Sequence, residues 1–258
     1  MTHQIGLIGY GRIGEDLAER IRAAPDTELA YVYVRSPKPE IDERQLTDPE
    51  EIADHPVDLV VEAATPAVLA ELAEPILAGA DLLALSGSAF ADPEVEDRLT
   101  DLATASEHGL YLPHAALFGI DGLVDARDAL ESVHIEARKA PSHLDFEYAD
   151  AVDPAAIEGE TVLYEGPTRG LCERFPRNFN SHAAMALAGL GLDDTSSRLV
   201  VDPEQASAKH VITAIGPGFE LEAVRDSAIE GVTGDYTLVS TWGSVRRVLK
   251  ADEGLRFL

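Results

Sequence analysis

Three glycines near the start of the chain have the types and spacing that bind a dinucleotide. Residues 9–14 read Gly-Tyr-Gly-Arg-Ile-Gly and stand between an apolar strand-like run and a segment with helical spacing. There Gly9 is expected to make a tight turn, Gly11 to let a pyrophosphate approach the backbone, and Gly14 to allow close helix–strand packing. The N–H groups of Arg12 and Ile13 at the helix start would face the phosphates. The segment predicts NAD or NADP as cofactor.

The end of the second strand-like run bears on which of the two cofactors binds. An NAD-preferring fold places Asp or Glu there to hold the ribose hydroxyls. This chain reads Val-Tyr-Val-Arg-Ser at residues 32–36, so Arg35 and Ser36 are candidates for binding a 2′-phosphate. The pattern favours NADP and leaves NAD open, because Arg35 can also be read as a solvated loop residue.

Two further strand ends are rich in small residues. Residues 62–66 (Glu-Ala-Ala-Thr-Pro) and 86–92 (Ser-Gly-Ser-Ala-Phe-Ala-Asp) each follow an apolar run. Ala64, Thr65 and Ser88 are candidate cofactor contacts, since cofactors lie along the carboxyl ends of strands in open α/β sheets. The alternative is ordinary turn chemistry, with Thr65 capping a helix.

The second half of the chain supplies candidate acid–base chemistry. His210 stands at the entry to an apolar strand and has a side chain that can exchange protons near neutral pH. Asn178 and Asn180 precede a predicted helix over 181–192. The competing interpretations are a buried structural or surface histidine and two asparagines that cap the helix.

The elements that must position these residues fall into two groups. Strand-like runs at 5–8, 29–34, 59–61, 82–85 and 110–112 alternate with helical spacing at 13–21, 68–76 and 93–105. This alternation predicts a Rossmann-type, doubly wound parallel sheet in a dinucleotide-binding domain, residues 1–113.

Residues 114–234 are predicted to form a smaller α+β domain for substrate, catalysis and oligomerisation. Its strands at 133–137, 161–164, 198–201, 210–215 and 219–224, beside a helix near 122–130, predict a mostly antiparallel sheet. A C-terminal helix within 235–258 is expected to pack back on the first domain, and 145–160 reads as a loop.

Composition limits the possible partners and the setting. The 258 residues carry a formal net charge of −27, which argues against binding to nucleic acid or an anionic membrane. Only four lysines occur, so we interpret the acidic surface as that of a salt-loving organism's protein, with an ordinary acidic protein as the alternative. Cys172 is the only cysteine, which leaves no intramolecular disulfide and no cysteine cluster for zinc, and we expect no metal site. No secretory leader or membrane span is visible, so we expect a cytoplasmic protein.

With these features, the chain resembles the L-aspartate dehydrogenase family over nearly its full length. The resemblance rests on the glycine segment, residues 62–66 and 88–92, 119–123, Phe-Pro-Arg-Asn-Phe-Asn at 175–180, and Asp202-Pro203 followed by His210. It implies NAD(P)-dependent oxidation of aspartate to iminoaspartate, or the reverse amination of oxaloacetate, feeding NAD synthesis. It further implies that His210 is the catalytic histidine. Ala116, with Asn178 or Asn180, is implied to contact the cofactor.

One segment departs from the family pattern. Where the family has Ser-Gly-Ala, this chain reads His114-Ala115-Ala116, followed by the bulky Phe118. His114 is therefore a candidate for the substrate pocket that competes with His210. Arg177 and Lys209 are the candidate cations for a small dicarboxylic amino acid.

Two other functions stay open beside this one. One is a reductase or dehydrogenase of the homoserine or dihydrodipicolinate type, which share the glycine segment and residues 62–66. The other is a protein that senses NAD(P) without catalysis. A homodimer is expected through an open sheet edge of the second domain.

Overall fold

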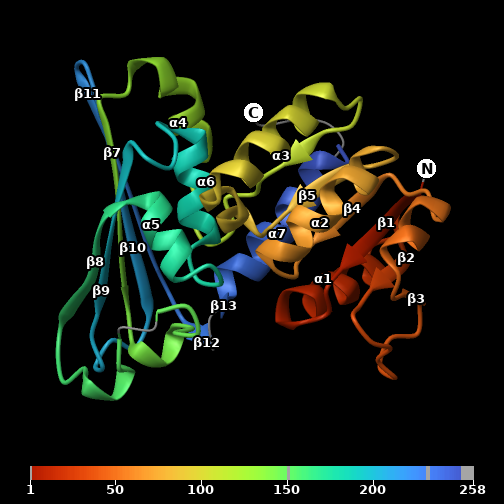
Figure 1. Cartoon of the computed structure of the whole chain (residues 1–258), viewed down its shortest axis with the longest axis horizontal. Helices are drawn as coiled ribbons and strands as arrows, with labels where there is room; N and C mark the ends of the chain where they lie inside the picture. Colours follow the sequence, from red (N-terminus) through yellow and green to blue (C-terminus); the bar gives the residue numbers. More distant parts are fainter. Residues whose placement is uncertain (1, 150–151, 231–232, 251–258) are drawn as a thin grey trace. The chain divides into compact units, whose positions relative to one another are not determined.

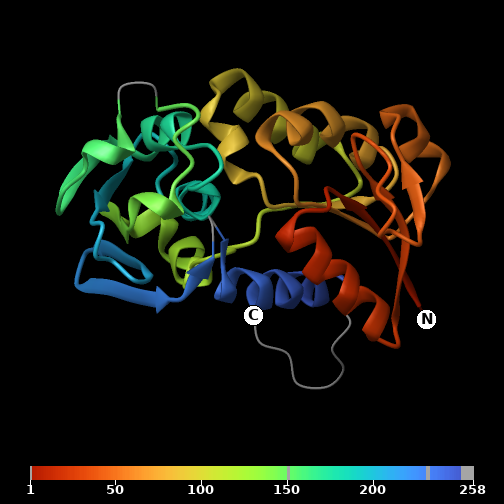
Figure 2. The same cartoon turned by 90° about the horizontal axis from the view of Figure 1, so that it is seen from below.

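The computed structural model describes residues 2–149, 152–230 and 233–250. The chain forms two compact units (Figures 1 and 2). Unit 1 comprises Met1–Ala89, Pro93–Pro113 and the residues from Leu238 onward, and unit 2 comprises Phe90–Asp92 and His114–Thr237. No helix in these described ranges is long and apolar enough to cross a membrane.

Unit 1 is built on a six-stranded parallel sheet in the order β3-β2-β1-β4-β5-β6. The strands are β1 (His3–Ile8), β2 (Thr27–Tyr33), β3 (Arg44–Leu46), β4 (Leu59–Glu62), β5 (Asp81–Ala84) and β6 (Leu110–Tyr111). The helices are α1 (Arg12–Ala23), α2 (Pro66–Leu77), α3 (Pro93–Ala105) and the body of α7 (Asp235–Val248), with short 3₁₀ turns η1 (Pro49–Asp54) and η2 (Gly87–Ala91). Figure 2 shows α1 and α7 on one face of the sheet and α2 and α3 on the other. The doubly wound parallel sheet is therefore confirmed, and its order reverses between β1 and β4.

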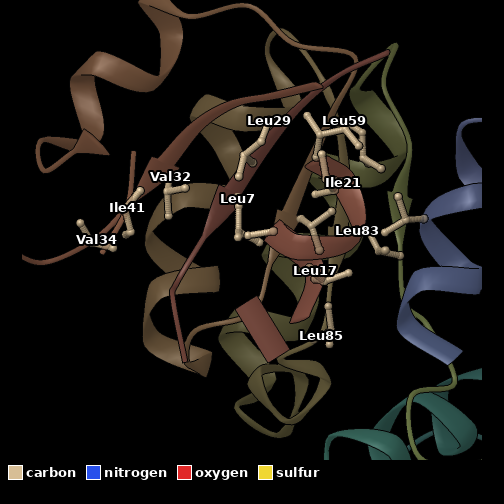
Figure 3. Packing of buried hydrophobic residues seen from close by; sticks show 14 residues of the cluster. Leu7, Leu17, Ile21, Leu29, Val32, Val34, Ile41, Leu59, Leu83 and Leu85 are labelled. Atoms are coloured by element: carbon tan, nitrogen blue, oxygen red, sulfur yellow. The ribbon is translucent and has the colours of Figure 1, made fainter. Parts of the chain in front are cut away.

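The apolar positions that predicted α1 form the contact with the sheet. Leu17 and Ile21 lie one helical turn apart and are fully buried against strand residues such as Leu7, Leu59 and Leu83 (Figure 3). Val245 of α7 belongs to the same cluster. Each such side chain contributes roughly 1.5–3 kcal/mol through burial, so this packing fixes where α1 begins after β1.

Unit 2 is built on a five-stranded sheet in the order β11-β10-β7-β9-β8. The strands are β7 (Ser132–Lys139), β8 (Thr161–Pro167), β9 (Thr195–Val201), β10 (Ala208–Gly216) and β11 (Phe219–Ser227), followed by the small pair β12 (Ile229–Glu230) and β13 (Thr233–Gly234). Three of the four pairings in the large sheet are antiparallel, and only β7–β9 is parallel. The prediction of a mostly antiparallel sheet is confirmed. The parallel pair arises because the chain between β7 and β9 crosses over through helices.

The helices of unit 2 lie against one face of this sheet (Figure 1). They are α4 (Ile120–Ala126), α5 (Thr168–Arg174) and α6 (Asn180–Ala188), with 3₁₀ turns η3 (Arg127–Ala129), η4 (Pro141–His143) and η5 (Pro154–Ala156). Along β7 and β10 alternate residues are buried, so one face of each strand points toward the helices. The functional side chains of this unit come from that face.

Several elements differ from the sequence prediction. The helix predicted over 181–192 ends at Ala188, because Gly189 follows it and Gly191 takes a φ of +88° that continues no helix. Helix α5 and the short strand β3 were not predicted, since neither seven nor three residues give a clear period. The predicted loop 145–160 contains η5 and includes residues 150–151, which lie outside the described residues, as does the end of the predicted 235–258 helix beyond residue 250.

Candidate functional site

Two of the three glycines after β1 are required by the protein's own packing. Gly9 has a φ of +90°, and a Cβ there would stand 2.6 Å from the carbonyl oxygen of Ala63 at the end of β4. A Cβ on Gly14 would collide with the carbonyl oxygen of Gly9. Gly11 differs, because a Cβ on it would meet nothing within 4 Å. The protein itself therefore gives no steric reason for glycine at position 11, and the space beside that backbone is open.

This open space lies at the start of a helix. Gly11 is the N-cap of α1 and offers no side-chain cap to the first-turn N–H groups. Arg12 and Ile13 are the first two helical residues, and both are half-buried. A glycine-lined helix N-terminus with its positive dipole end exposed suits a diphosphate, so the residues present fit the dinucleotide that the sequence predicts.

The carboxyl end of β2 and the residues that follow it, 33–36, carry no carboxylate. Tyr33 is the last strand residue, and Arg35 and Ser36 that follow are exposed. Nearby, the ammonium group of Lys38 lies 5.9 Å from the ring centroid of Tyr10 in the glycine segment. Lys38 therefore lies beside the glycine loop, where it also pairs with Glu40 (3.4 Å), and is an addition to the candidates named from sequence.

A buried carboxyl group ties the ends of β4 and β5 together. Glu62 is fully buried and accepts hydrogen bonds from the Ala64 N–H (2.7 Å), the Ser86 N–H (3.0 Å) and the Ser86 hydroxyl (2.8 Å). Burial raises the pKa of Glu62, and these donors offset part of that rise. Its role is to fix the loops that carry the small residues, a role not assigned to it from the sequence.

The candidate residues on those loops are placed differently from one another. Ala64 is exposed, whereas the Thr65 hydroxyl accepts from the Val68 N–H (3.4 Å) and caps α2. Ser88 is buried within η2. Of these three, Ala64 is the most exposed and Ser88 the least.

In unit 2, strand register brings a histidine and two cations onto the helix-covered face of the sheet. His210 on β10 is directly opposite Arg225 on β11 and opposite Ala137 on β7. Lys139 follows Ala137 by two residues and so points to the same face. All three polar side chains are buried, with His210 2%, Lys139 3% and Arg225 7% exposed.

Helix α6 covers this group with a second histidine. The rings of His182 and His210 are 5.5 Å apart and nearly perpendicular. His182 Nδ1 shares a hydrogen bond with the Ser197 hydroxyl (3.2 Å), which in turn bonds to the Thr168 hydroxyl (2.8 Å). Each of these two rings has one buried nitrogen without a hydrogen-bond partner within the described residues, His182 Nε2 and His210 Nδ1. The cluster thus holds polar atoms that its own side chains leave unsatisfied.

The electrostatics of the cluster keep His210 neutral. Burial lowers the pKa of His210 well below its ordinary value, and the charges of Lys139, His182 and Arg225 lower it further. Burial, with a smaller contribution from Arg225, lowers the pKa of Lys139 to about 7. A neutral imidazole has a free lone pair, so His210 can accept a proton once a bound anion offsets these charges.

Arg225 also fixes the loop that departs from the family pattern. Its Nε donates to the Ala116 carbonyl (2.7 Å) and its Nη1 to the Ala208 carbonyl (2.8 Å) at the start of β10. The loop is strained, because Ala115 has a φ of +47°. His114 Nδ1 is hydrogen-bonded to the Leu117 carbonyl within the loop. The Ala116 loop and the strand bearing His210 are therefore held to each other by one side chain.

The two candidate asparagines differ in how they are used. Asn178 accepts from the Asp145 N–H (2.9 Å) and donates to the His143 carbonyl (3.1 Å), so both ends of its amide are engaged in holding that turn. Asn180 is half-buried and is the first residue of α6. Asn178 is therefore engaged within the protein at both ends of its amide.

The two cations expected to bind the substrate are not brought to His210. Arg177 is 44% exposed and forms ion pairs with Asp145 (2.9 Å) and Glu147 (2.8 Å). Lys209 precedes His210 on β10 and so points to the opposite face of the sheet.

The structure places Lys139, His182 and Arg225 beside His210, and none of them was singled out from the sequence. A signal was present for Lys139, since it continues the buried alternation of Val133, Ile135 and Ala137 with a charged residue.

Comparison with known proteins agrees with both units. The sequence model described as "Homoserine dehydrogenase, NAD binding domain" matches residues 9–113, and that described as "Aspartate dehydrogenase, C-terminal" matches residues 121–248. The chain is 34% identical to an aspartate dehydrogenase domain-containing protein of Xenopus tropicalis, with 94% of this chain and 93% of the relative covered. It is 32% identical to an L-aspartate dehydrogenase of Nitrosopumilus maritimus, with 87% and 89% covered.

Among solved structures, the aspartate dehydrogenase of Thermotoga maritima matches with a TM-score of 0.79 over 100% of both chains, at 24% identity, which shows a shared fold. Full-length relatives above 30% identity and a matching C-terminal family model point to the same family. The chain therefore belongs to the L-aspartate dehydrogenase family.

Proposed function

We propose that the protein is an NAD(P)-dependent dehydrogenase that oxidises the CH–NH₂ group of L-aspartate to iminoaspartate, which yields oxaloacetate, or runs the reverse amination. Unit 1 binds the dinucleotide, and unit 2 supplies the substrate site and the acid–base group. The observation that carries the proposal is the buried, neutral His210 surrounded by cations in a member of this family. A neutral base and positive charge are what an amino acid with two carboxylates requires.

The cofactor is assigned to the residues that fit it. The open backbone at Gly11, with Gly9, Arg12, Ile13 and Gly14, holds the diphosphate at the start of α1. We assign the remainder of the dinucleotide to two further groups of residues. One group is Ala64, Thr65 and Ser88 at the ends of β4 and β5. The other is Ala116 and Asn180, which are assigned on the family resemblance. When bound, NAD(P)⁺ accepts the hydride that leaves the substrate Cα.

His210 prepares the substrate for that loss. A hydride leaves Cα only when the nitrogen lone pair is available, so the substrate ammonium group must first give up a proton. The neutral imidazole of His210 accepts it, and burial together with the charges of Lys139 and Arg225 keeps the imidazole unprotonated until substrate arrives. The negative charge of bound substrate offsets those cations and makes His210 a stronger base at that moment.

We further propose that NADP is preferred over NAD. Arg35 and Ser36 are exposed where β2 has ended, and no carboxylate stands among residues 32–36 to hold the ribose hydroxyls. An exposed guanidinium suits the 2′-phosphate.

The physiological setting is also a proposal. The net charge of −27 and the small number of lysines support a protein that works at high salt in the cytoplasm. The strands β8 and β11 are the edges of the large sheet in the described part of unit 2, which supports a homodimer formed through this unit. Iminoaspartate as product is consistent with a role in NAD biosynthesis.

A steady-state assay of the purified protein tests the activity. L-Aspartate, L-homoserine and dihydrodipicolinate are each offered with both nicotinamide cofactors in the appropriate redox state, at low and high salt. Turnover of L-aspartate is expected to exceed turnover of the other two. Turnover of homoserine or dihydrodipicolinate without turnover of aspartate would refute the proposed substrate. Tight cofactor binding without any turnover would indicate a sensor.

A further inference from the structure

Lys139 is a buried ammonium group without an anionic partner. It is the last residue of β7 and is 3% exposed. Its Nζ lies 5.0 Å from the ring centroid of Phe179, and it has no hydrogen bond or ion pair with any side chain in the described ranges. The other basic side chains of unit 2 with similar reach, such as Arg138 and Arg198, are paired with Glu136 at 2.7 Å.

The titratable groups that face Lys139 are basic. They are Arg225 on β11, His210 on β10, His182 on α6 and His143 at the end of η4, and each shifts the pKa of Lys139 or has its own pKa shifted by it. No carboxylate is among the causes that shift the pKa of Lys139. Within the described residues, basic groups therefore cluster around Lys139, and Asp226 acts on Arg225 rather than on Lys139, in a chain whose net charge is −27.

A buried ammonium group without a counter-charge destabilises the fold, and a bound anion would offset this cost. Removing an ammonium group from water without a counter-charge is costly, and Met would fill the same space without that cost. Three buried ring nitrogens close to Lys139, His210 Nδ1, His182 Nε2 and His143 Nδ1, also have no partner among the described residues. Unpaired positive charge together with unsatisfied donors and acceptors is the complement of a bound carboxylate.

We propose that Lys139 binds a carboxylate group of the substrate and so places the substrate amine at His210. The inference rests on the proposed function only in naming L-aspartate as the molecule whose carboxylate is bound. Strand register supports the placement, because Lys139 is a diagonal neighbour of His210 on the same face of adjacent strands. Diagonal neighbours have Cα atoms about 7–8 Å apart, a spacing that one small amino acid can bridge.

Lys139→Met is the test variant, and the exposed Lys250→Met is the matched control. Lys139→Met is expected to fold, because the buried charge it removes opposes folding. With a pKa of about 7 in the folded protein and a higher ordinary value, Lys139 binds more protons in the unfolded chain between those values. Folding stability therefore falls as the pH drops toward 7 in the wild type, and the variant escapes this loss.

Two measurements at pH 7 are made on both variants and the wild type. The first is calorimetric titration with succinate, a dicarboxylate that cannot be oxidised at an amine. Lys139→Met is expected to weaken succinate binding about 10- to 100-fold, the size expected for losing a charge-assisted hydrogen bond, with NAD(P) affinity unchanged. The second is kcat/KM for L-aspartate and for L-2-aminobutyrate, which lacks the side-chain carboxylate.

If Lys139→Met loses kcat/KM for aspartate but not for 2-aminobutyrate, Lys139 binds the side-chain carboxylate. If kcat/KM falls equally for both substrates, Lys139 binds the α-carboxylate. Unchanged succinate affinity with unchanged KM in Lys139→Met overturns the inference, as does an equal loss in the control Lys250→Met. If the wild type binds succinate through Lys139 yet does not oxidise aspartate, the proposed function fails while the inference stands.

Discussion

Replacing Gly11 with Ala is expected to weaken NAD(P) binding and to leave folding stability nearly unchanged. A Cβ at this position meets no protein atom within 4 Å, and the backbone φ of −95° is one that alanine adopts readily. Alanine is a poorer N-cap than glycine, at a cost of about 0.5–1 kcal/mol. It also restricts the unfolded chain, which gains about 0.4–1 kcal/mol. The two effects cancel to within about 0.5 kcal/mol, or roughly 1–2 °C in Tm.

The effect on cofactor binding is larger because the new methyl group enters the space assigned to the diphosphate. Losing one backbone hydrogen bond to a charged phosphate costs about 1.5–3 kcal/mol, which corresponds to a Kd raised roughly 10- to 100-fold. Fluorescence titration with NADPH and NADH measures Kd, and thermal denaturation without cofactor measures stability.

Gly9→Ala is the matched comparison, because the protein itself forbids a side chain there. A left-handed φ of +90° costs alanine about 1–2 kcal/mol, and relieving the 2.6 Å contact with the Ala63 carbonyl oxygen adds about 1–3 kcal/mol. The sum of roughly 2–5 kcal/mol lowers Tm by about 5–15 °C. Wild-type cofactor affinity in Gly11→Ala, or equal destabilisation by both substitutions, would refute the assignment of this loop.

Three further substitutions test other parts of the account. His210→Ala is expected to lower kcat about 10²- to 10⁴-fold with little change in NAD(P) affinity, as for the loss of a general base, and unchanged turnover would remove His210 from the mechanism. Arg35→Ala should raise the Kd for NADP more than that for NAD, whereas equal effects in titrations with both would place the 2′-phosphate elsewhere. Ala115→Gly should raise the free energy of unfolding by up to about 1 kcal/mol in denaturant titration, since φ is +47° there, and a decrease would contradict the strained loop.

The fold of unit 1 was predictable because its signals are local. Buried parallel strands are short apolar runs, and the four-residue spacing of Ile13, Leu17 and Ile21 marks a helix without reference to the rest of the chain. The glycine spacing likewise carries its mechanical reason in the sequence. Glu62 was different, because its bonds to Ser86 join residues 24 positions apart, and nothing in either segment indicates the pairing.

The cluster around His210 was less predictable because strand register creates it. Arg225, His210 and Lys139 come from three strands and meet only when β10 pairs with both β7 and β11 in one alignment. Sequence proximity pointed instead to Lys209 and Arg177, and the alternation of a strand turns a neighbour in sequence to the opposite face. A charged residue that continues a buried alternation, as Lys139 does, was the available signal.

Transfer of isotope from substrate to coenzyme tests the central claim most directly. L-[2-²H]aspartate is incubated with the protein and NADP⁺ or NAD⁺, and the reduced coenzyme is examined by mass spectrometry. The reduced coenzyme formed by the wild type is expected to carry one deuterium, and His210→Ala is expected to form almost no reduced coenzyme in the same time. Reduced coenzyme without deuterium, or no reduction by the wild type with either coenzyme, would contradict it.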